Sequence, residues 1–308
     1  MISVALCSFN GEKFIQEQLF SIINQSYTID EIVICDDGST DSTLTIINGI
    51  AATTHIPIYL HQNEVNIGVC ANFEKALSLC KGDIILLSDQ DDIWYSDKVK
   101  TIVSWFETHP QKSAVFSDAT LINDNEDSFS EKTLWDCIGF NKKMRSYFDN
   151  GLSLETFFIN KATGATMAIR KVIWFPFAQY CNNDNVLHDY CIALKALDND
   201  ELGYIDKPLI QYRLHGNQQA GISYQLQHPE IFSNIHRPLC NIPTSFTFNN
   251  IQTRKRATFG HKRAESTLFQ TLAHCFSYIT HYKIKGFCFY LYDVAYKTTA
   301  LLNRKKQR

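Results

Sequence analysis

Apolar runs and amphipathic stretches alternate along most of the first 220 or so residues. Short runs rich in Val, Ile and Leu predict buried strands, and apolar positions that recur every three to four residues predict helices. Strands are expected within segments 2–8, 30–42, 56–62, 82–92, 113–123 and 163–171, and helices within 14–25, 68–80, 96–110 and 187–197. This alternation predicts an α/β fold in which helices flank a Rossmann-like, mostly parallel sheet with right-handed crossovers.

Three segments depart from the alternation. Residues 124–150 are polar and rich in Asp, Asn, Ser and Lys, and we interpret them as a loop. Residues 202–216 are expected to form a pair of strands interrupted by Pro208. Further along, the pattern becomes helical, basic and aromatic. The sequence therefore predicts a folded α/β domain over 1–220 and a helical extension over 221–308.

Charge is distributed unevenly between these two parts. The chain has 29 Lys or Arg and 32 Asp or Glu, a net charge of -3, and 45% of its residues are hydrophobic, which is enough for a sizeable core. Residues 254–308 hold 12 of the basic and 2 of the acidic residues (+10), which leaves 17 basic and 30 acidic residues (-13) for 1–253. The same segment contains 10 aromatic residues. An ordinary helical subdomain would fit, but we favour docking on an anionic membrane, and we expect no nucleic-acid partner.

The ten cysteines are scattered along the chain without a CxxC pair. This distribution is typical of free thiols in a reducing cytosol, and it argues against a disulfide framework or a zinc site. The segment MISVALCSFN lacks the positive region of a signal peptide, and no apolar run reaches the ~18 residues that cross a bilayer. We therefore expect a cytoplasmic protein, peripheral on the cytosolic face of the inner membrane if the extension docks there.

Several aspartates follow the predicted strands where these strands end. Asp36 and Asp37 end the second strand, and Asp89 and Asp91 end the fourth. Asp118 is expected to end the fifth. Because ligands of open parallel sheets bind beyond the carboxyl ends of the strands, these side chains should share one rim. Each aspartate alone could be a cap or a turn residue, but together they repel unless a cation compensates them, which favours Mg²⁺ or Mn²⁺.

The glycine pattern excludes the usual phosphate-binding loops. No GxGxxG follows the first strand, and no GxxxxGK[ST] is present. Backbone amides of a Gly-rich loop are therefore not expected to hold a phosphate. A metal ion on the aspartates would neutralise a diphosphate instead.

The ordered motifs VALCSFNGEKFIQEQLFSIINQSY, DEIVICDDGSTDST, NIGVCANFEKAL and LLSDQDDIW together resemble glycosyltransferase family 2, which has the glycosyltransferase A fold. SDQDDIW, followed by TGATMAIR, HDYCIAL and YRLHGNQ, is most similar to the bacterial rhamnosyltransferase-type branch. The resemblance covers about residues 1–220. It implies a nucleotide-sugar-binding half over 1–120 and an acceptor-binding half over 121–220.

The resemblance also implies which residues contact the donor. Phe9 matches an aromatic residue that stacks on the nucleotide base, and Asp37 matches the aspartate that reads the base. Cys7 stands where many relatives have Thr. The implied donor contacts are Cys7, Ser8, Phe9, Asn10, Asp36, Asp37, Asn66, Gly68, Asp89 and Arg213.

Metal and catalytic roles follow from the same matches. Asp91 matches the metal ligand of a DxD motif, and Asp89 matches a residue that contacts the metal or the ribose. His215 matches a late residue near the diphosphate and is taken as a further ligand of Mn²⁺ or Mg²⁺. Asp189 matches the general base, although an aspartate at a helix start is often only a partner of the helix dipole.

The acceptor site is the least defined part of the resemblance. Its implied residues are Trp94, Asp118, Gly164, Thr166 and His188. For most of them a packing or turn role is an open alternative. Cys191 stands where an aromatic residue is common, which leaves the identity of the acceptor open.

The implied reaction is an inverting displacement at the anomeric carbon of a nucleoside-diphosphate sugar, such as dTDP-rhamnose or a UDP-sugar. The acceptor would be a saccharide or lipid-linked saccharide of a surface polysaccharide, such as O-antigen or capsule. A nucleotidyltransferase is an alternative, but it would need a basic Gly-rich loop where CSFNGEKF has one Gly. A non-catalytic sugar-nucleotide-binding module is another, which the intact Asp37, Asp91 and Asp189 disfavour.

Overall fold

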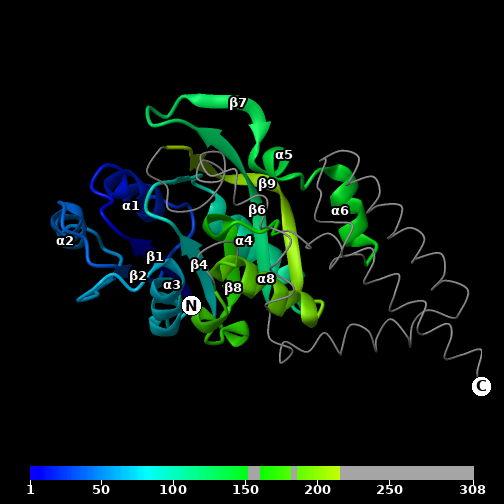
Figure 1. The fold of residues 1–308 in the computed structure, drawn as a ribbon, viewed down its shortest axis with the longest axis horizontal. Coiled ribbons are helices and arrows are strands. Elements are labelled where there is room, and N and C mark those ends of the chain that lie inside the picture. The colour runs from blue at the N-terminus through cyan, green and yellow to red at the C-terminus, as the bar shows by residue number, and fades with distance from the viewer. Residues whose placement is uncertain (152–159, 182–185, 216–308) are drawn as a thin grey trace, which may run out of the picture. The chain divides into compact units, whose positions relative to one another are not determined.

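The computed structural model of the chain describes residues 1–215, except 152–159 and 182–185 (Figure 1). Its N-terminal part contains β1 (Ile2–Ser8), α1 (Ile15–Ile23), β2 (Glu31–Asp36), α2 (Thr43–Ala51), β3 (Ile58–Gln62), α3 (Val69–Leu79) and β4 (Ile84–Ser88). The rest contains β5 (Ile93–Trp94), α4 (Lys98–Thr108), β6 (Ala114–Ile122), β7 (Ser128–Thr133), α5 (Leu134–Ile138), α6 (Lys142–Asp149), β8 (Met167–Arg170), α8 (His188–Asp198) and β9 (Leu202–Arg213). The elements predicted up to residue 123 are confirmed, whereas the predicted extension and its boundary lie outside the described residues.

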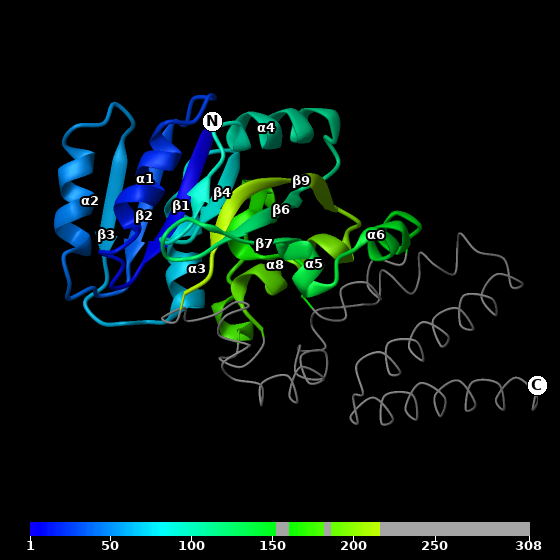
Figure 2. The ribbon, with the colours of Figure 1, turned by 90° about the horizontal axis from the view of Figure 1, so that it is seen from above.

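One sheet has the strand order β3-β2-β1-β4-β8-β6-β9-β5, with β7 paired to β6. The strands from β3 to β4 in this order are parallel, as are β6 and β9, whereas β8 runs antiparallel to both β4 and β6. Figure 2 shows α4 on one side of the sheet and α3 and α8 on the other. The α/β fold is therefore confirmed, with a parallel N-terminal half joined through β8 to a mixed second half.

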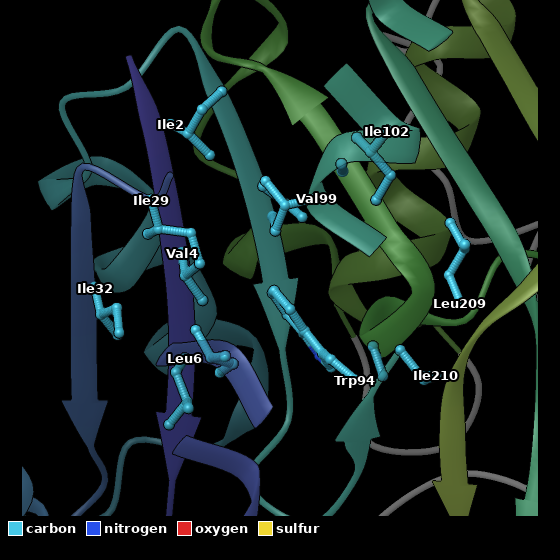
Figure 3. Packing of buried hydrophobic residues seen from close by; sticks show 14 of the residues in the cluster. Ile2, Val4, Leu6, Ile29, Ile32, Trp94, Val99, Ile102, Leu209 and Ile210 are labelled. Carbon is cyan, nitrogen blue, oxygen red and sulfur yellow. The ribbon is translucent and has the colours of Figure 1, made fainter. Parts of the chain in front are cut away.

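Helices on both faces of the sheet explain why its central strands are continuously apolar. Every residue of β1, β2 and β4 is buried, because a strand covered on both faces has no solvated side on which polar residues would alternate. Figure 3 shows part of this core, which includes Ile2, Val4 and Leu6 of β1, Val99 and Ile102 of α4, and Leu209 and Ile210 of β9. The core spans both halves of the sheet and therefore fixes the strand ends of one half relative to the other.

The interpretation of residues 124–150 as a loop is wrong, because this segment forms β7, α5 and α6. Its polar residues include helix caps: Thr133 and Asp136 form a capping box at the start of α5, and Asn141 Oδ1 accepts backbone N–H groups at the start of α6. Trp135 is 1% exposed and anchors α5 in the core. Such short elements carry too few apolar positions to show a period, so their caps are the better signal.

Residues 202–213 form one continuous strand rather than an interrupted pair. β9 passes through Pro208 because its parallel pairing with β6 shifts register around Asp118, the partner of Pro208. A register shift accommodates a residue that has no N–H to donate to the ladder. Asp118 therefore lies inside β6 and not at its end, contrary to the prediction.

Candidate active site

The carboxylate of Asp36 holds the turn that follows β2. Asp36 is fully buried, its Oδ1 accepts the hydroxyl of Ser8 at 2.8 Å, and its Oδ2 accepts the N–H of Ser39 at 2.8 Å. The Ser39 hydroxyl in turn accepts the N–H of Asn10 at 2.8 Å. Ser8, Asn10 and Asp36 thus join the ends of β1 and β2, and their direct contact with a donor stays a prediction.

Asp37 is surrounded by donors from the loop after β3. Its Oδ1 accepts Asn63 Nδ2 and the N–H of Ile67, both at 2.8 Å, and its Oδ2 accepts the N–H of Gly68 at 2.9 Å. Gly68 has a φ of 86°, which favours glycine, and Asn66 Oδ1 accepts the same Gly68 N–H at 3.1 Å. Because Asp37 Oδ2 accepts a single N–H, it can accept a second hydrogen bond, as recognition of a nucleotide base would require.

Gln90 links the loop after β1 to the loop after β4. Its Oε1 accepts the N–H of Phe9 at 2.9 Å, and its Nε2 donates to the carbonyl of Phe9 at 3.0 Å. A Cβ added to Gly11 would lie 2.1 Å from Gln90 Oε1, so a side chain at this position would displace the Gln90 amide from Phe9. The predicted donor segment from Cys7 to Asn10 therefore lies beside the predicted metal segment. No local pattern revealed this role of Gln90.

Asp89, Asp91 and Asp92 form a carboxylate cluster after β4. Burial, with the charges of Asp91 and Asp189, raises the pKa of Asp89 to about 7. Burial and the other two carboxylates also raise the pKa of Asp92, which is 1% exposed. Asp92 Oδ2 has no hydrogen-bond partner within the described residues. The cluster therefore favours any positive charge that reaches it.

His215, which follows β9, reaches this cluster. Its Nε2 lies 2.9 Å from Asp91 Oδ2, so two predicted metal ligands meet across 124 positions of sequence. Across the part of the chain that the structure describes, no group of three or more His, Cys, Asp or Glu side chains is arranged to hold a metal ion. A pair of protein ligands suits Mg²⁺ or Mn²⁺ sites in which substrate phosphates complete the shell.

Arg213 contacts the loop that carries the carboxylate cluster. It is 1% exposed, its Nε donates to the carbonyl of Asp91 at 2.9 Å, and its Nη2 pairs with Glu17 Oε2 at 2.6 Å. Its backbone N–H donates to Asp92 Oδ1 at 3.1 Å, and its guanidinium lies 4.6 Å from the ring centroid of Phe14. Protein acceptors hold the Nε and Nη2 of Arg213, and its predicted contact with the diphosphate stays a prediction.

Asp189 lies in the first turn of α8 and within electrostatic reach of the cluster. Its Oδ2 accepts the N–H of Gly164 at 3.1 Å, and its Oδ1 accepts the N–H of Tyr190 at 2.6 Å. Burial raises the pKa of Asp189, and these N–H groups oppose the increase. The Asp189 charge contributes in turn to the raised pKa of Asp89. The fold therefore brings the predicted base and the predicted metal ligands to one place.

The side chains around Asp189 are packed rather than open. His188 is 4% exposed and stacks on Phe73 with ring centroids 3.9 Å apart. A Cβ added to Gly164 would lie 2.5 Å from His188 Nε2. Thr166 is 1% exposed, and its hydroxyl donates to the carbonyl three residues earlier. His188, Gly164 and Thr166 thus shape the surroundings of the predicted base, and their contact with an acceptor stays a prediction.

Trp94 and Asp118 lie in packed surroundings, and their contact with an acceptor stays a prediction. Trp94 is 4% exposed and belongs to the core (Figure 3), because its ring packs against residues of both halves of the sheet. Asp118 Oδ1 accepts the N–H of Trp135 at 3.0 Å and that of Ala119 at 2.8 Å. Tertiary packing therefore makes Trp94 a core anchor and Asp118 a partner of the first turn of α5.

Comparisons with known proteins identify the family of the chain. Residues 3–173 match the family model described as glycosyl transferase family 2. The chain is 30% identical over 240 residues to the dTDP-rhamnosyl transferase RfbG of Shigella flexneri, covering 73% of this chain and 78% of that protein.

Two solved structures share the fold at lower identity. S. aureus TarS in complex with UDP-GlcNAc matches 79% of this chain and 67% of its own, with a TM-score of 0.53 and 18% identity. The mannosyltransferase PcManGT from Pyrobaculum calidifontis, in complex with GDP-Man and Mn²⁺, matches 93% of this chain and 84% of its own, with a TM-score of 0.51 and 17% identity. These neighbours have the glycosyltransferase A fold.

Proposed function

The chain belongs to glycosyl transferase family 2, and from this premise we propose that it is a metal-dependent enzyme that transfers a sugar with inversion from a nucleoside-diphosphate sugar to a saccharide hydroxyl. The observation that carries the proposal is the convergence of two predicted functions. His215 meets Asp91 at 2.9 Å, and the Asp189 carboxylate lies close enough to Asp89 to raise its pKa. Donor, metal and base would then act at one point of the fold.

Asp91 and His215 would hold Mn²⁺ or Mg²⁺, with Asp89 contacting the metal or the ribose. The fit rests on Asp92 Oδ2, a buried carboxylate oxygen with no hydrogen-bond partner among the described residues. Burial and the neighbouring carboxylates also raise the pKa values of Asp89 and Asp92. Carboxylate oxygens suit either cation, and an imidazole suits Mn²⁺ better than Mg²⁺. When bound, the ion would neutralise negative charge that develops on the leaving diphosphate.

The nucleotide would lie beside Phe9 and Asp37. Phe9 is partly exposed, and Gln90 fixes its backbone, so its ring can offer a face to a base. Asp37 is held by three N–H groups and is therefore oriented before a ligand arrives. These features support recognition of a nucleoside diphosphate at the ends of β1 and β2.

Asp189 would accept the proton of the attacking hydroxyl. Its Oδ2 is held by the N–H of Gly164, which fixes the direction of the carboxylate. The hydroxyl attacks the anomeric carbon as the bond to the diphosphate oxygen breaks, and its proton moves to Asp189. The raised pKa of Asp189 makes it a stronger base than an exposed aspartate.

Rhamnose is the sugar that we propose first, because the similar Shigella protein is named as a dTDP-rhamnosyl transferase. The acceptor would be a saccharide or lipid-linked saccharide of a surface polysaccharide such as O-antigen or capsule. Specificity would lie in the loops around Asp189 rather than in the carboxylate cluster.

Incubation with a panel of sugar nucleotides and Mn²⁺ tests the proposal. Transfer or slow hydrolysis of one sugar nucleotide, lost with EDTA and restored by Mn²⁺, is the expected result. Release of pyrophosphate from a nucleoside triphosphate and a sugar phosphate would indicate a nucleotidyltransferase. Binding without turnover of any panel member, across a set of saccharide acceptors, would indicate a non-catalytic module.

We further propose that the basic, aromatic segment 254–308 docks the enzyme on the cytosolic face of an anionic membrane. This segment lies outside the described residues, and within those residues no helix has the length and hydropathy to span a bilayer. The full chain should sediment with phosphatidylglycerol vesicles at low salt and release at high salt. Equal sedimentation of a chain truncated after residue 250 would contradict this role.

A further inference from the structure

Lys98 is a buried cation between the carboxylate cluster and the loop that holds Asp189. It is the first residue of α4 and has no exposed surface. Its Nζ donates to the carbonyl of Ala165 at 2.8 Å and lies 3.7 Å from the ring centroid of Trp94. Neither the sequence pattern nor the family resemblance singled it out.

A buried ammonium at the start of a helix needs a physical reason. Burial disfavours the charge, and so does the positive end of the α4 dipole. Burial lowers the pKa of Lys98 to about 7, and the charges of Asp92 and Asp89 oppose that decrease. The two carboxylates thus favour a charge that burial disfavours, at a position where an apolar side chain of the same length would pack without this cost.

The hydrogen bond from Lys98 to Ala165 connects Lys98 with the turn that holds the predicted base, Asp189. Ala165 is the middle residue of the tight turn Gly164–Thr166, which closes through a hydrogen bond from the Thr166 N–H to the Thr163 carbonyl at 2.9 Å. The first residue of that turn, Gly164, donates its N–H to Asp189 Oδ2. The turn cannot slide toward α8, because the His188 ring already fills the space beside Gly164.

We propose that Lys98 is a positioning residue for sugar transfer: its Nζ joins the Trp94 ring, two positions after Asp92, to the Gly164–Thr166 turn and thereby sets the place of Asp189 relative to the donor end of the site. An in-line displacement needs the base and the leaving group on opposite sides of one carbon, so an error of about 1 Å costs up to ~10²-fold in rate. The inference rests on the proposed role of Asp189 as base.

The test compares Lys98→Met with Lys161→Met in the full-length protein. Lys161 is a matched control, because it is 4% exposed, its Nζ also donates to a backbone carbonyl, that of Ile138, and burial is the only cause of its lowered pKa. Lys98→Met should lower kcat roughly 10-fold or more. Its Kd for the sugar nucleotide with Mn²⁺ should hold or tighten, since one competing positive charge is gone. Lys161→Met should keep the wild-type kcat.

A double-mutant cycle separates the role of Lys98 from that of the base itself. If Lys98 acts through Asp189, then Lys98→Met should lower the residual rate of Asp189→Asn no further. If the double variant instead loses rate by the product of the two single-variant factors, the positioning role is overturned and the base assignment stays intact. An unchanged kcat in Lys98→Met would also overturn the positioning role. The same holds if the activity of Lys98→Met falls only because it binds the donor more weakly and has a lower Tm than Lys161→Met. A wild-type rate in Asp189→Asn would instead refute the base, and the role of Lys98 with it.

Discussion

Two groups of aspartates follow β2 and β4, the parallel strands on either side of β1, and look alike in sequence, but their surroundings in the fold differ. Asp36 and Asp37, after β2, receive backbone and side-chain donors on both oxygens of each carboxylate. In the group after β4, Asp92 Oδ2 has no partner among the described residues, and burial raises the pKa of Asp89 and Asp92.

The difference separates a structural carboxylate from one that awaits a ligand. A carboxylate that accepts several N–H groups is stable as an anion and orders the loops around it. A buried carboxylate beside like charges is destabilised until a cation arrives. A cation is therefore expected to bind where the fold leaves carboxylate charge uncompensated, whereas the fold orients Asp36 and Asp37 and needs no cation there.

The largest effect is expected for Asp91→Asn, which should lower the transfer rate by roughly 10³-fold, because a metal ion contributes several kcal/mol to a transition state. Binding of the sugar nucleotide measured by calorimetry should lose its dependence on Mn²⁺. Asp200→Asn, at a side chain that is 85% exposed, is the control and should leave both quantities unchanged. Retained Mn²⁺-dependent binding in Asp91→Asn would refute the assignment of the metal ligand.

Asp189→Asn should lower kcat by roughly 10²-fold or more, with the Kd of the sugar nucleotide nearly intact. The raised pKa of Asp189 means that its charge destabilises the fold at neutral pH, but an amide cannot accept the N–H groups of both Gly164 and Tyr190. The two effects on stability oppose each other, so the variant should stay folded at the assay temperature. A fall in Tm that explains the lost activity would contradict a direct role. Differential scanning fluorimetry beside steady-state kinetics makes this measurement.

The pH dependence of the transfer rate should also reflect the raised pKa of Asp189. A base must be deprotonated, so the rate should fall as the pH drops through the raised pKa of Asp189, starting at a higher pH than for an exposed aspartate. The contribution of Asp189 to folding stability changes with pH in the opposite direction. A group whose pKa is raised in the folded state stabilises the fold most at low pH, and this contribution is lost as the pH rises through that pKa. The Tm of Asp189→Asn relative to wild type should therefore rise with pH. A pH profile of kcat that is identical in wild type and Asp189→Asn would contradict the assignment.

The sequence predicts the local features of the site better than the contacts between distant segments. Apolar runs and the aspartates after them are local features, so β1, β2 and β4 and the positions of Asp37 and Asp91 followed from the pattern. Gln90 and Lys98 did not, because their partners lie 81 and 67 positions away. A local pattern cannot reveal which distant backbone group a polar side chain will meet.

Burial separates some predicted site residues from the surface. Trp94 and Arg213 stand next to functional motifs in sequence, yet both are nearly inaccessible, because Trp94 pairs with β9 in the sheet and Arg213 pairs with Glu17 of α1. Asp118 was expected at a strand end because Asp is common there, but the register shift opposite Pro208 places it inside β6. A family motif therefore locates a site more reliably than it assigns each side chain within it.

Asp37→Asn tests the structural side of the comparison and should have the smallest effect on chemistry. An amide cannot accept on both of its heavy atoms, so its NH₂ would face either the Gly68 N–H or the donors on Oδ1, and one buried donor would lose its partner. Such a loss costs about 1–3 kcal/mol, or a Tm lower by several degrees for a domain of this size.

Asp91→Asn is the matched control for that measurement. It removes a carboxylate whose charge raises the pKa of its neighbours, and an amide can still pair with His215 Nε2, so Tm should hold or rise. The two variants should therefore give opposite results: Asp37→Asn loses stability and keeps cation-dependent turnover of a bound donor, whereas Asp91→Asn keeps stability and loses that turnover. If both variants lost Tm equally, the carboxylates after β4 would also be structural, and the distinction between the two groups would fail.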